Sequence, residues 1–175
     1  VQAYTILRDA GIPVGLIMDP LGDFSSIAPL GLGFEVNVAR QGLTADPRGG
    51  LNPAFPHFRL ATGVEEWLAE VPPLMAPFGE ANWGPAHTPL FFQRIGGILT
   101  EDPLVTVTQT AEGRGMVMLG EGSWRWRQVG YLRTGSHDLF DDFVGKLTQF
   151  LTSDPGVDRF RVESPRILNE DQRLQ

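Results

Sequence analysis

Three histidines are the side chains of this chain best suited to acid–base or metal chemistry, and each stands apart from the others. His57, His87 and His137 lie in separate segments, and none has the second ligand at close spacing that a metal site needs. Ser136 and Asp138 flank His137, but a serine–histidine–aspartate triad takes its members from separate elements, which three consecutive residues cannot imitate. Glycine motifs that cradle phosphates are also absent. We therefore expect no catalytic residue, no metal and no cofactor.

One polar and aromatic cluster follows a short apolar run and is the best candidate for a binding surface. The run at 116–119 is continuous rather than alternating, which predicts a strand covered on both faces. Ligands of open α/β sheets bind beyond the carboxyl ends of such strands, where acidic and aromatic groups could hold a sugar or a peptide. Alternatively, the tryptophans close the edge of the domain while the arginines stack on them or pair with acids. The candidate ligand-binding residues are Glu121, Ser123, Trp124, Arg125 and Trp126.

Composition indicates one loop-rich globular domain. The 175 residues can bury a sizeable core, and 21 glycines with 14 prolines predict many turns and shaped loops. A formal net charge of −7 argues against a nucleic-acid partner, because phosphate binding needs a basic face. The absence of cysteine excludes thiolate nucleophiles, zinc–thiolate sites and disulfides within the sequence. No apolar run approaches the roughly 20 residues that span a bilayer, so we expect no direct membrane insertion by this segment.

The first half of the chain contains short elements between long loops. A helix at 3–10 should stop at Gly11, and Pro13 should precede a strand at 14–18 that is buried on both faces. Alternation predicts a half-exposed strand at 34–38. The many proline and glycine turns at 40–61 predict no regular element there. A short helix at 64–70 ends at two prolines, and its Trp67 should pack in the core.

The second half has clearer patterns. Strands are expected at 88–95, 104–109 and 116–119, with a turn at 112–115. Apolar residues at 139–151 recur with the spacing of an amphipathic helix, for which Asp138 is the expected N-cap and Asp141 complements the positive helix end. Alternation at 159–163 predicts one more strand.

Several motifs of the chain together form a specific pattern: Trp67, the runs 71–74, 103–107 and 113–120, the triplet 124–126 and the helix at 140–151. Through these motifs, residues 43–163 resemble the class I glutamine amidotransferase-like domain of large bacterial membrane-anchored proteins that also carry von Willebrand factor A-type regions. The resemblance implies an α/β fold with three layers, in which helices flank a mostly parallel sheet, as in flavodoxin-like proteins. It also implies a domain at 1–155, incomplete at its N-terminus, and a linker or first strand of a following β-sandwich at 156–175.

Active enzymes that this chain resembles use a cysteine in a Gly-x-Cys-x-Gly turn and a His-x-Glu pair after a later strand. This chain has no cysteine, and residues 120–123 read Gly-Glu-Gly-Ser where the pair is expected. A thiolate–imidazole mechanism therefore lacks both its nucleophile and its base. The resemblance implies the fold without glutaminase activity.

Two functions follow as expectations. The first is a non-catalytic module that acts as an interaction or scaffold domain of a multidomain bacterial cell-envelope protein. Its partners would be other domains of that protein or a separate protein, and it would be a soluble domain of a membrane-anchored chain. The alternative is a domain that binds or hydrolyses a small ligand, a sugar or peptide, through the loop from Glu121 to Arg127.

Overall fold

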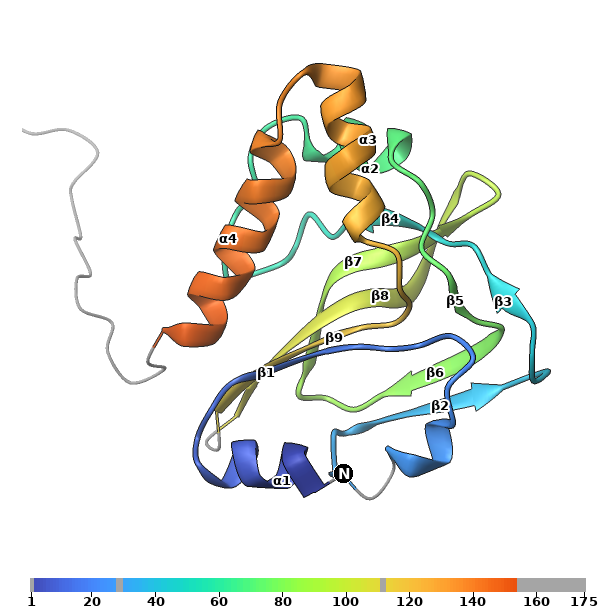
Figure 1. Cartoon of the computed structure of the whole chain (residues 1–175), viewed down its shortest axis with the longest axis vertical. Helices are drawn as coiled ribbons and strands as arrows, with labels where there is room; N and C mark the ends of the chain where they lie inside the picture. Colours follow the sequence, from blue (N-terminus) through green and yellow to red (C-terminus); the bar gives the residue numbers. More distant parts are fainter. Residues whose placement is uncertain (1, 28–29, 111–112, 154–175) are drawn as a thin grey trace, which may run out of the picture.

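The computed structural model describes residues 2–27, 30–110 and 113–153, which form a mixed α/β fold (Figure 1). A five-stranded sheet lies at its centre, with the strand order β1-β9-β8-β7-β4. In that order the strands are Val14–Ile17, Gly113–Met118, Ile98–Thr110, His87–Ile95 and Arg48–Leu51. The α/β class expected from the sequence is therefore confirmed.

The sheet is mixed, and the expectation of a mostly parallel sheet is wrong. β1 and β9 are parallel, whereas the β9–β8, β8–β7 and β7–β4 pairs are antiparallel. A two-residue turn, Gly96 and Gly97, joins β7 to β8, and both glycines have positive φ angles, of 59° and 86°. Such a turn can only connect antiparallel neighbours, because a parallel pair needs a long crossover.

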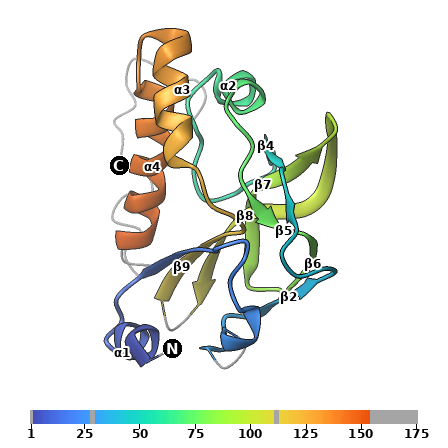
Figure 2. The ribbon, with the colours of Figure 1, turned by 45° about the vertical axis from the view of Figure 1, so that its right-hand side comes forward.

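Three helices cover one face of the sheet: α2 (Val64–Glu70), α3 (Trp124–Thr134) and α4 (Asp138–Thr152) (Figures 1 and 2). The amphipathic helix expected at 139–151 is confirmed as α4, with carboxylates in its first turn. Its N-cap is His137, one residue before the expected Asp138. Residues 124–127, expected in a loop, form the first turn of α3. The buried residues of α4 are Phe143, Leu147 and Phe150.

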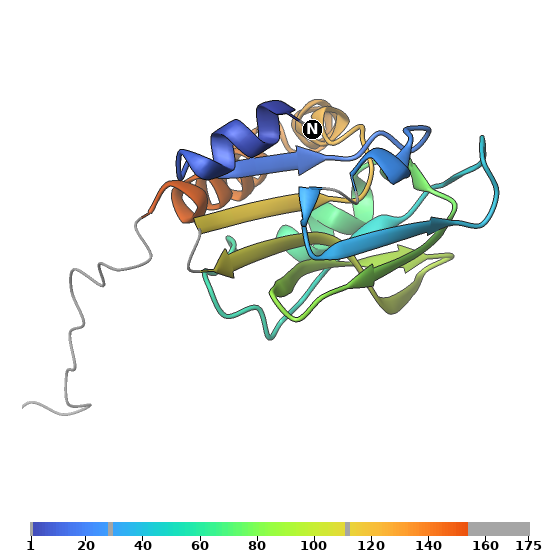
Figure 3. The same ribbon diagram turned by 90° about the horizontal axis from the view of Figure 1, so that it is seen from below.

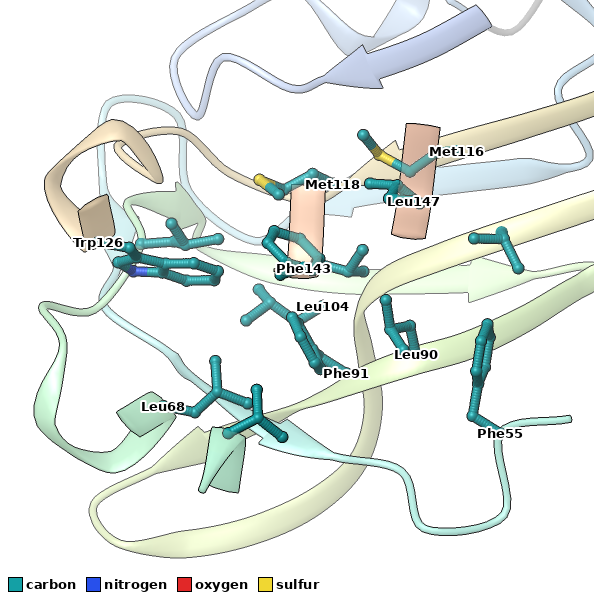
Figure 4. Packing of buried hydrophobic residues seen from close by; sticks show 14 of the residues in the cluster. Phe55, Leu68, Leu90, Phe91, Leu104, Met116, Met118, Trp126, Phe143 and Leu147 are labelled. Carbon is teal, nitrogen blue, oxygen red and sulfur yellow. The ribbon is translucent and has the colours of Figure 1, made fainter. Parts of the chain in front are cut away.

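The main core lies between these helices and the sheet (Figure 4). Trp67 of α2 is buried as expected, and its ring meets the ring of Trp126 edge-on at 5.7 Å between centroids. Met116 and Met118 of β9 face this core, whereas Val117 belongs to a second cluster on the opposite face. The continuous apolar run of β9 is thus covered on both faces, as the sequence predicted.

A two-stranded ribbon and α1 occupy the opposite face (Figure 3). β2 (Phe34–Val38) pairs antiparallel with β6 (Gly79–Trp83), and the ribbon packs through Phe34 onto Met18 and Val117. The helix α1 (Gln2–Asp9) leads into β1, and η1 (Phe24–Ser26) lies between β1 and β2. A second small ribbon joins β3 (Thr44–Ala45) to β5 (Ala76–Pro77).

β3 and β4 lie in the segment 40–61, for which no regular element was expected. The sequence did not predict β4 because two of its four residues are glycines, which have low strand propensity. Close approach explains their presence: a Cβ on Gly49 would lie 3.0 Å from a Leu68 methyl, and one on Gly50 would lie 2.2 Å from a Leu99 methyl.

The expected strand at 159–163 and the linker at 156–175 lie outside the described residues. The boundary at 155 therefore stays a prediction. Among the helices of the described ranges, none has the length and apolar character needed to cross a membrane.

Candidate functional site

The exit of β9 holds Glu121 by its backbone. The Glu121 amide donates to the Met75 carbonyl at 2.9 Å, and the Met75 amide donates to the Glu121 carbonyl at 3.0 Å. The flanking Gly120 and Gly122 have φ angles of 137° and 99°, which a residue with a Cβ rarely adopts. The Glu121 side chain is exposed, and Ser123 stands at the N-cap of α3 without a capping bond from its hydroxyl. Met75 and Glu121 thus form an isolated antiparallel bridge, which links the residue before β5 to the segment that follows β9.

Arg125 and Trp126 anchor the proline segment that follows α2. The Arg125 Nη2 donates to the Pro73 carbonyl at 2.6 Å, and the Trp126 Nε1 donates to the Pro72 carbonyl at 2.7 Å. Trp126 has no exposed surface. Arg125 and Trp126 thus fit the alternative expectation, in which these side chains close the edge of the domain. Arg125, however, bonds to a carbonyl rather than to an acidic side chain.

Trp124 differs from its neighbour. Its side chain is 63% exposed, and two other exposed residues of α3, Tyr131 and Leu132, follow seven and eight positions later on the same side of the helix. None of the five candidate ligand-binding residues lines either of two cavities described below. The five residues thus lie close together in the chain but do not share one surface. Arg125 and Trp126 face inward, whereas Glu121 and Trp124 are exposed. Their ligand-binding role stays a prediction.

The three histidines are as separate in space as in sequence. His57 contacts the rings of Phe55 and Phe150, and desolvation, with the positive charge of Arg114, lowers its pKa. His137 lies near the Arg127 carbonyl at 3.2 Å from its Nδ1. Within the described ranges, no three residues of the metal-binding types gather. The segment 136–138 leads into α4, and there the Ser136 hydroxyl accepts a hydrogen bond from the Asp138 amide at 3.0 Å.

His87 begins β7 and is buried, which the sequence did not predict. Its Nε2 lies 2.8 Å from the Leu32 carbonyl and its Nδ1 lies 3.0 Å from the Thr106 hydroxyl. Because a carbonyl only accepts, Nε2 carries the proton and Nδ1 accepts from Thr106. Burial lowers the pKa of His87 and outweighs the opposing hydrogen bond to Leu32. Both ring nitrogens are occupied, so His87 ties β7 to the loop before β2 rather than acting as a free base.

A cavity of about 180 Å³ lies beside His87, beneath α1. The polar side chains that line it are Tyr4, Arg8, His87, Thr108, Thr110 and Arg114. Arg8 is already paired with Asp9 at 3.2 Å and also reaches the Leu30 carbonyl at 3.5 Å. Among the described residues, the cavity therefore offers hydroxyls and two guanidinium groups, and its histidine, His87, has both ring nitrogens in hydrogen bonds rather than free to act as a base.

Among the described residues, β1 lies at one end of the sheet and pairs with β9 alone. No charged residue occurs in β1. The expectation of a strand buried on both faces is wrong, since Ile17 is 56% exposed. α1 buries no residue and turns an apolar stripe to solvent, where Ile6 is 61% exposed. We call α1, the following loop and β1 the β1 edge region; its exposed large aliphatic residues are Ile6, Leu7, Ile12 and Ile17.

Comparisons with known proteins assign no family. No protein-family model, no curated protein and no solved structure matches this chain. The amidotransferase resemblance rests on the sequence motifs between Trp67 and the helix at 140–151.

Proposed function

We propose that this chain is a non-catalytic, amidotransferase-like module that binds a neighbouring domain or protein within a multidomain bacterial cell-envelope protein. The observation that carries the interaction role is the β1 edge region, in which β1 has a single strand partner among the described residues. Edge strands present unpaired N–H and C=O groups, and proteins usually protect them with charges, covering loops or short length. β1 is short but uncharged, and its surroundings expose four large aliphatic side chains.

An extended segment is the partner chemistry that fits this edge. An added strand pairs with the whole row of backbone donors and acceptors at a sheet edge. α4 lies on one face of the β1–β9 pair, where Leu151 approaches Gly15, and α1 lies on the other face. A strand added at β1 would therefore enter between helices.

Two observations support the non-catalytic part of the proposal. The 175 residues contain no cysteine, and the position after β9 carries a glutamate that is fixed through its backbone to Met75. The cell-envelope location and the membrane-anchored context are drawn from the resemblance alone.

Site-specific photo-cross-linking tests the interaction role. A photoreactive amino acid replaces Ile17 in bacterial cells that produce the protein, and Ile98 serves as the matched control. Ile98 is an equally apolar, 72% exposed isoleucine in the distant β7–β8 hairpin. We expect a discrete product from position 17 that maps to one extended segment, from the same polypeptide or a partner, and little product from position 98.

A synthetic peptide of the mapped segment then provides the confirming measurement. It should slow hydrogen–deuterium exchange of the amides of β1 without slowing exchange in β4, at the other end of the sheet. Equal cross-linking at both positions, or a peptide that leaves β1 exchange unchanged, would refute the proposal.

A further inference from the structure

Two arginines face each other across the strands β4 and β7. Arg48 and Arg94 are direct partners in the antiparallel register. Like charges directly opposite each other destabilise a sheet pair unless something neutralises them. Among the described residues, no carboxylate forms an ion pair with either one. Within the described part of the protein, neither guanidinium group is thus neutralised by a direct ion pair.

Carbonyl groups hold both guanidinium groups in place. The Arg48 Nη1 donates to the Ala69 carbonyl at 3.1 Å and also to the Val71 carbonyl, at the end of α2. The Arg94 Nη1 donates to the Gly97 carbonyl at 3.4 Å in the hairpin turn. The Arg94 Nε is buried and has no hydrogen-bond partner in the described residues. These bonds orient the arginines but neutralise neither charge.

Both arginines border one cavity of about 380 Å³. This volume falls within the range of roughly 300–1,000 Å³ typical of small-molecule sites. Gly96 and Gly97 form part of the wall, and a Cβ on either would meet no atom within 4 Å. Among the described residues, the lining holds one carboxylate, that of Asp46, two guanidinium groups and Ala69.

We propose that this cavity binds the phosphate group of a small molecule between Arg48 and Arg94. Arginine presents a planar fork of N–H groups that matches phosphate oxygens, and two such forks suit a doubly charged anion. Asp46 opposes the anion and weakens binding, so the affinity depends on the balance between two cations and one carboxylate. This site is remote from the β1 edge, at the opposite end of the sheet, and does not depend on the interaction role.

Titration with inorganic phosphate, followed by amide NMR at constant ionic strength, tests the site. We expect saturable shifts concentrated at residues 46–50 and 94–97, with weaker effects from acetate and none from chloride. Arg94→Gln should weaken phosphate binding by about tenfold or more, the effect of losing a charge-assisted hydrogen bond. Asp46→Asn should strengthen binding by about threefold, because it removes a nearby negative charge.

Arg133→Gln is the matched control, since it removes the same charge from an exposed position in α3. It should leave the phosphate affinity within about twofold. If Arg94→Gln does not fold, Arg94→Lys keeps the charge but loses the fork and should weaken binding to an intermediate degree. The proposal fails if acetate binds as tightly as phosphate, if Arg94→Gln and Arg133→Gln behave alike, or if Asp46→Asn does not bind more tightly.

Discussion

At the scale of single residues, two tryptophans that are two positions apart have opposite roles. Trp126 is fully buried and bonds to the Pro72 carbonyl, whereas Trp124 is largely exposed. Trp126→Phe should lower the free energy of unfolding by roughly 2–4 kcal/mol, because it leaves a cavity and an unpaired carbonyl. Trp124→Phe should change it by less than about 0.5 kcal/mol. Urea unfolding of the two variants measures both values, and equal losses would contradict the assigned roles.

His87 makes stability depend on pH. Burial lowers its folded-state pKa below the ordinary value of about 6.5, so the unfolded chain takes up the proton first as the pH falls. The contribution of neutral His87 is therefore complete above about pH 7. It declines as the pH falls below about 6.5 and continues to decline until the folded-state pKa is reached. Burial of His57 acts in the same direction.

NMR titration of the imidazole protons measures this effect directly. The His87 ring signal should titrate below pH 6.5 in the folded protein. Urea unfolding should show lower stability at pH 5.5 than at pH 7.5, and His87→Phe should reduce this pH dependence even though it also removes two hydrogen bonds. A His87 pKa at or above 6.5 would show that the ring is more solvated than its contacts indicate.

At the scale of elements, glycines inside α3 and α4 provide a comparison of helix packing. A Cβ on Gly130 of α3 would lie 2.9 Å from the buried Trp67 Nε1, whereas one on Gly145 of α4 meets nothing within 4 Å. Gly145→Ala should raise the free energy of unfolding by about 0.5–1 kcal/mol through helix propensity. Gly130→Ala should lower it by roughly 1–3 kcal/mol, because the Trp67 side chain must move.

Thermal and urea unfolding of these two variants provide the measurement, and each serves as the control for the other. The substitution and the secondary structure are the same, so helix propensity alone predicts the same sign for both. Opposite signs would show that α3 packs closely on α2 at Gly130. A gain in both variants would contradict that close contact.

At the scale of the whole molecule, the sheet has two different ends. One end is antiparallel and carries the Arg48–Arg94 pair. The other end is the parallel β1–β9 pair, in which β1 has no second strand partner among the described residues. Helices lie on both faces near β1, whereas the β2–β6 ribbon covers part of the second face. The interaction proposal and the phosphate proposal therefore concern separate regions, and either can fail without the other.

Local periodicity predicted several elements of this fold. The patterns are the apolar stripe of α4, the alternation of β2 and the continuous apolar run of β9. Each pattern is visible in residues a few positions apart, and each agrees with the burial seen in the structure. The β4 strand was missed because its glycines are explained by Leu68 and Leu99, which are distant in sequence. The burial of His87 was missed for the same reason, since its partners are Leu32 and Thr106.

The sequence by itself determined the helix and strand periodicities, the absence of a thiol nucleophile and the acidic net charge. Only the tertiary structure decided the direction of strand pairing, the place of β1 at the end of the described sheet, the inward and outward positions of the two tryptophans, and the opposition of Arg48 to Arg94. The physical reason is that periodicity depends on residues a few positions apart. Strand pairing and burial depend on contacts between segments that are far apart in the chain.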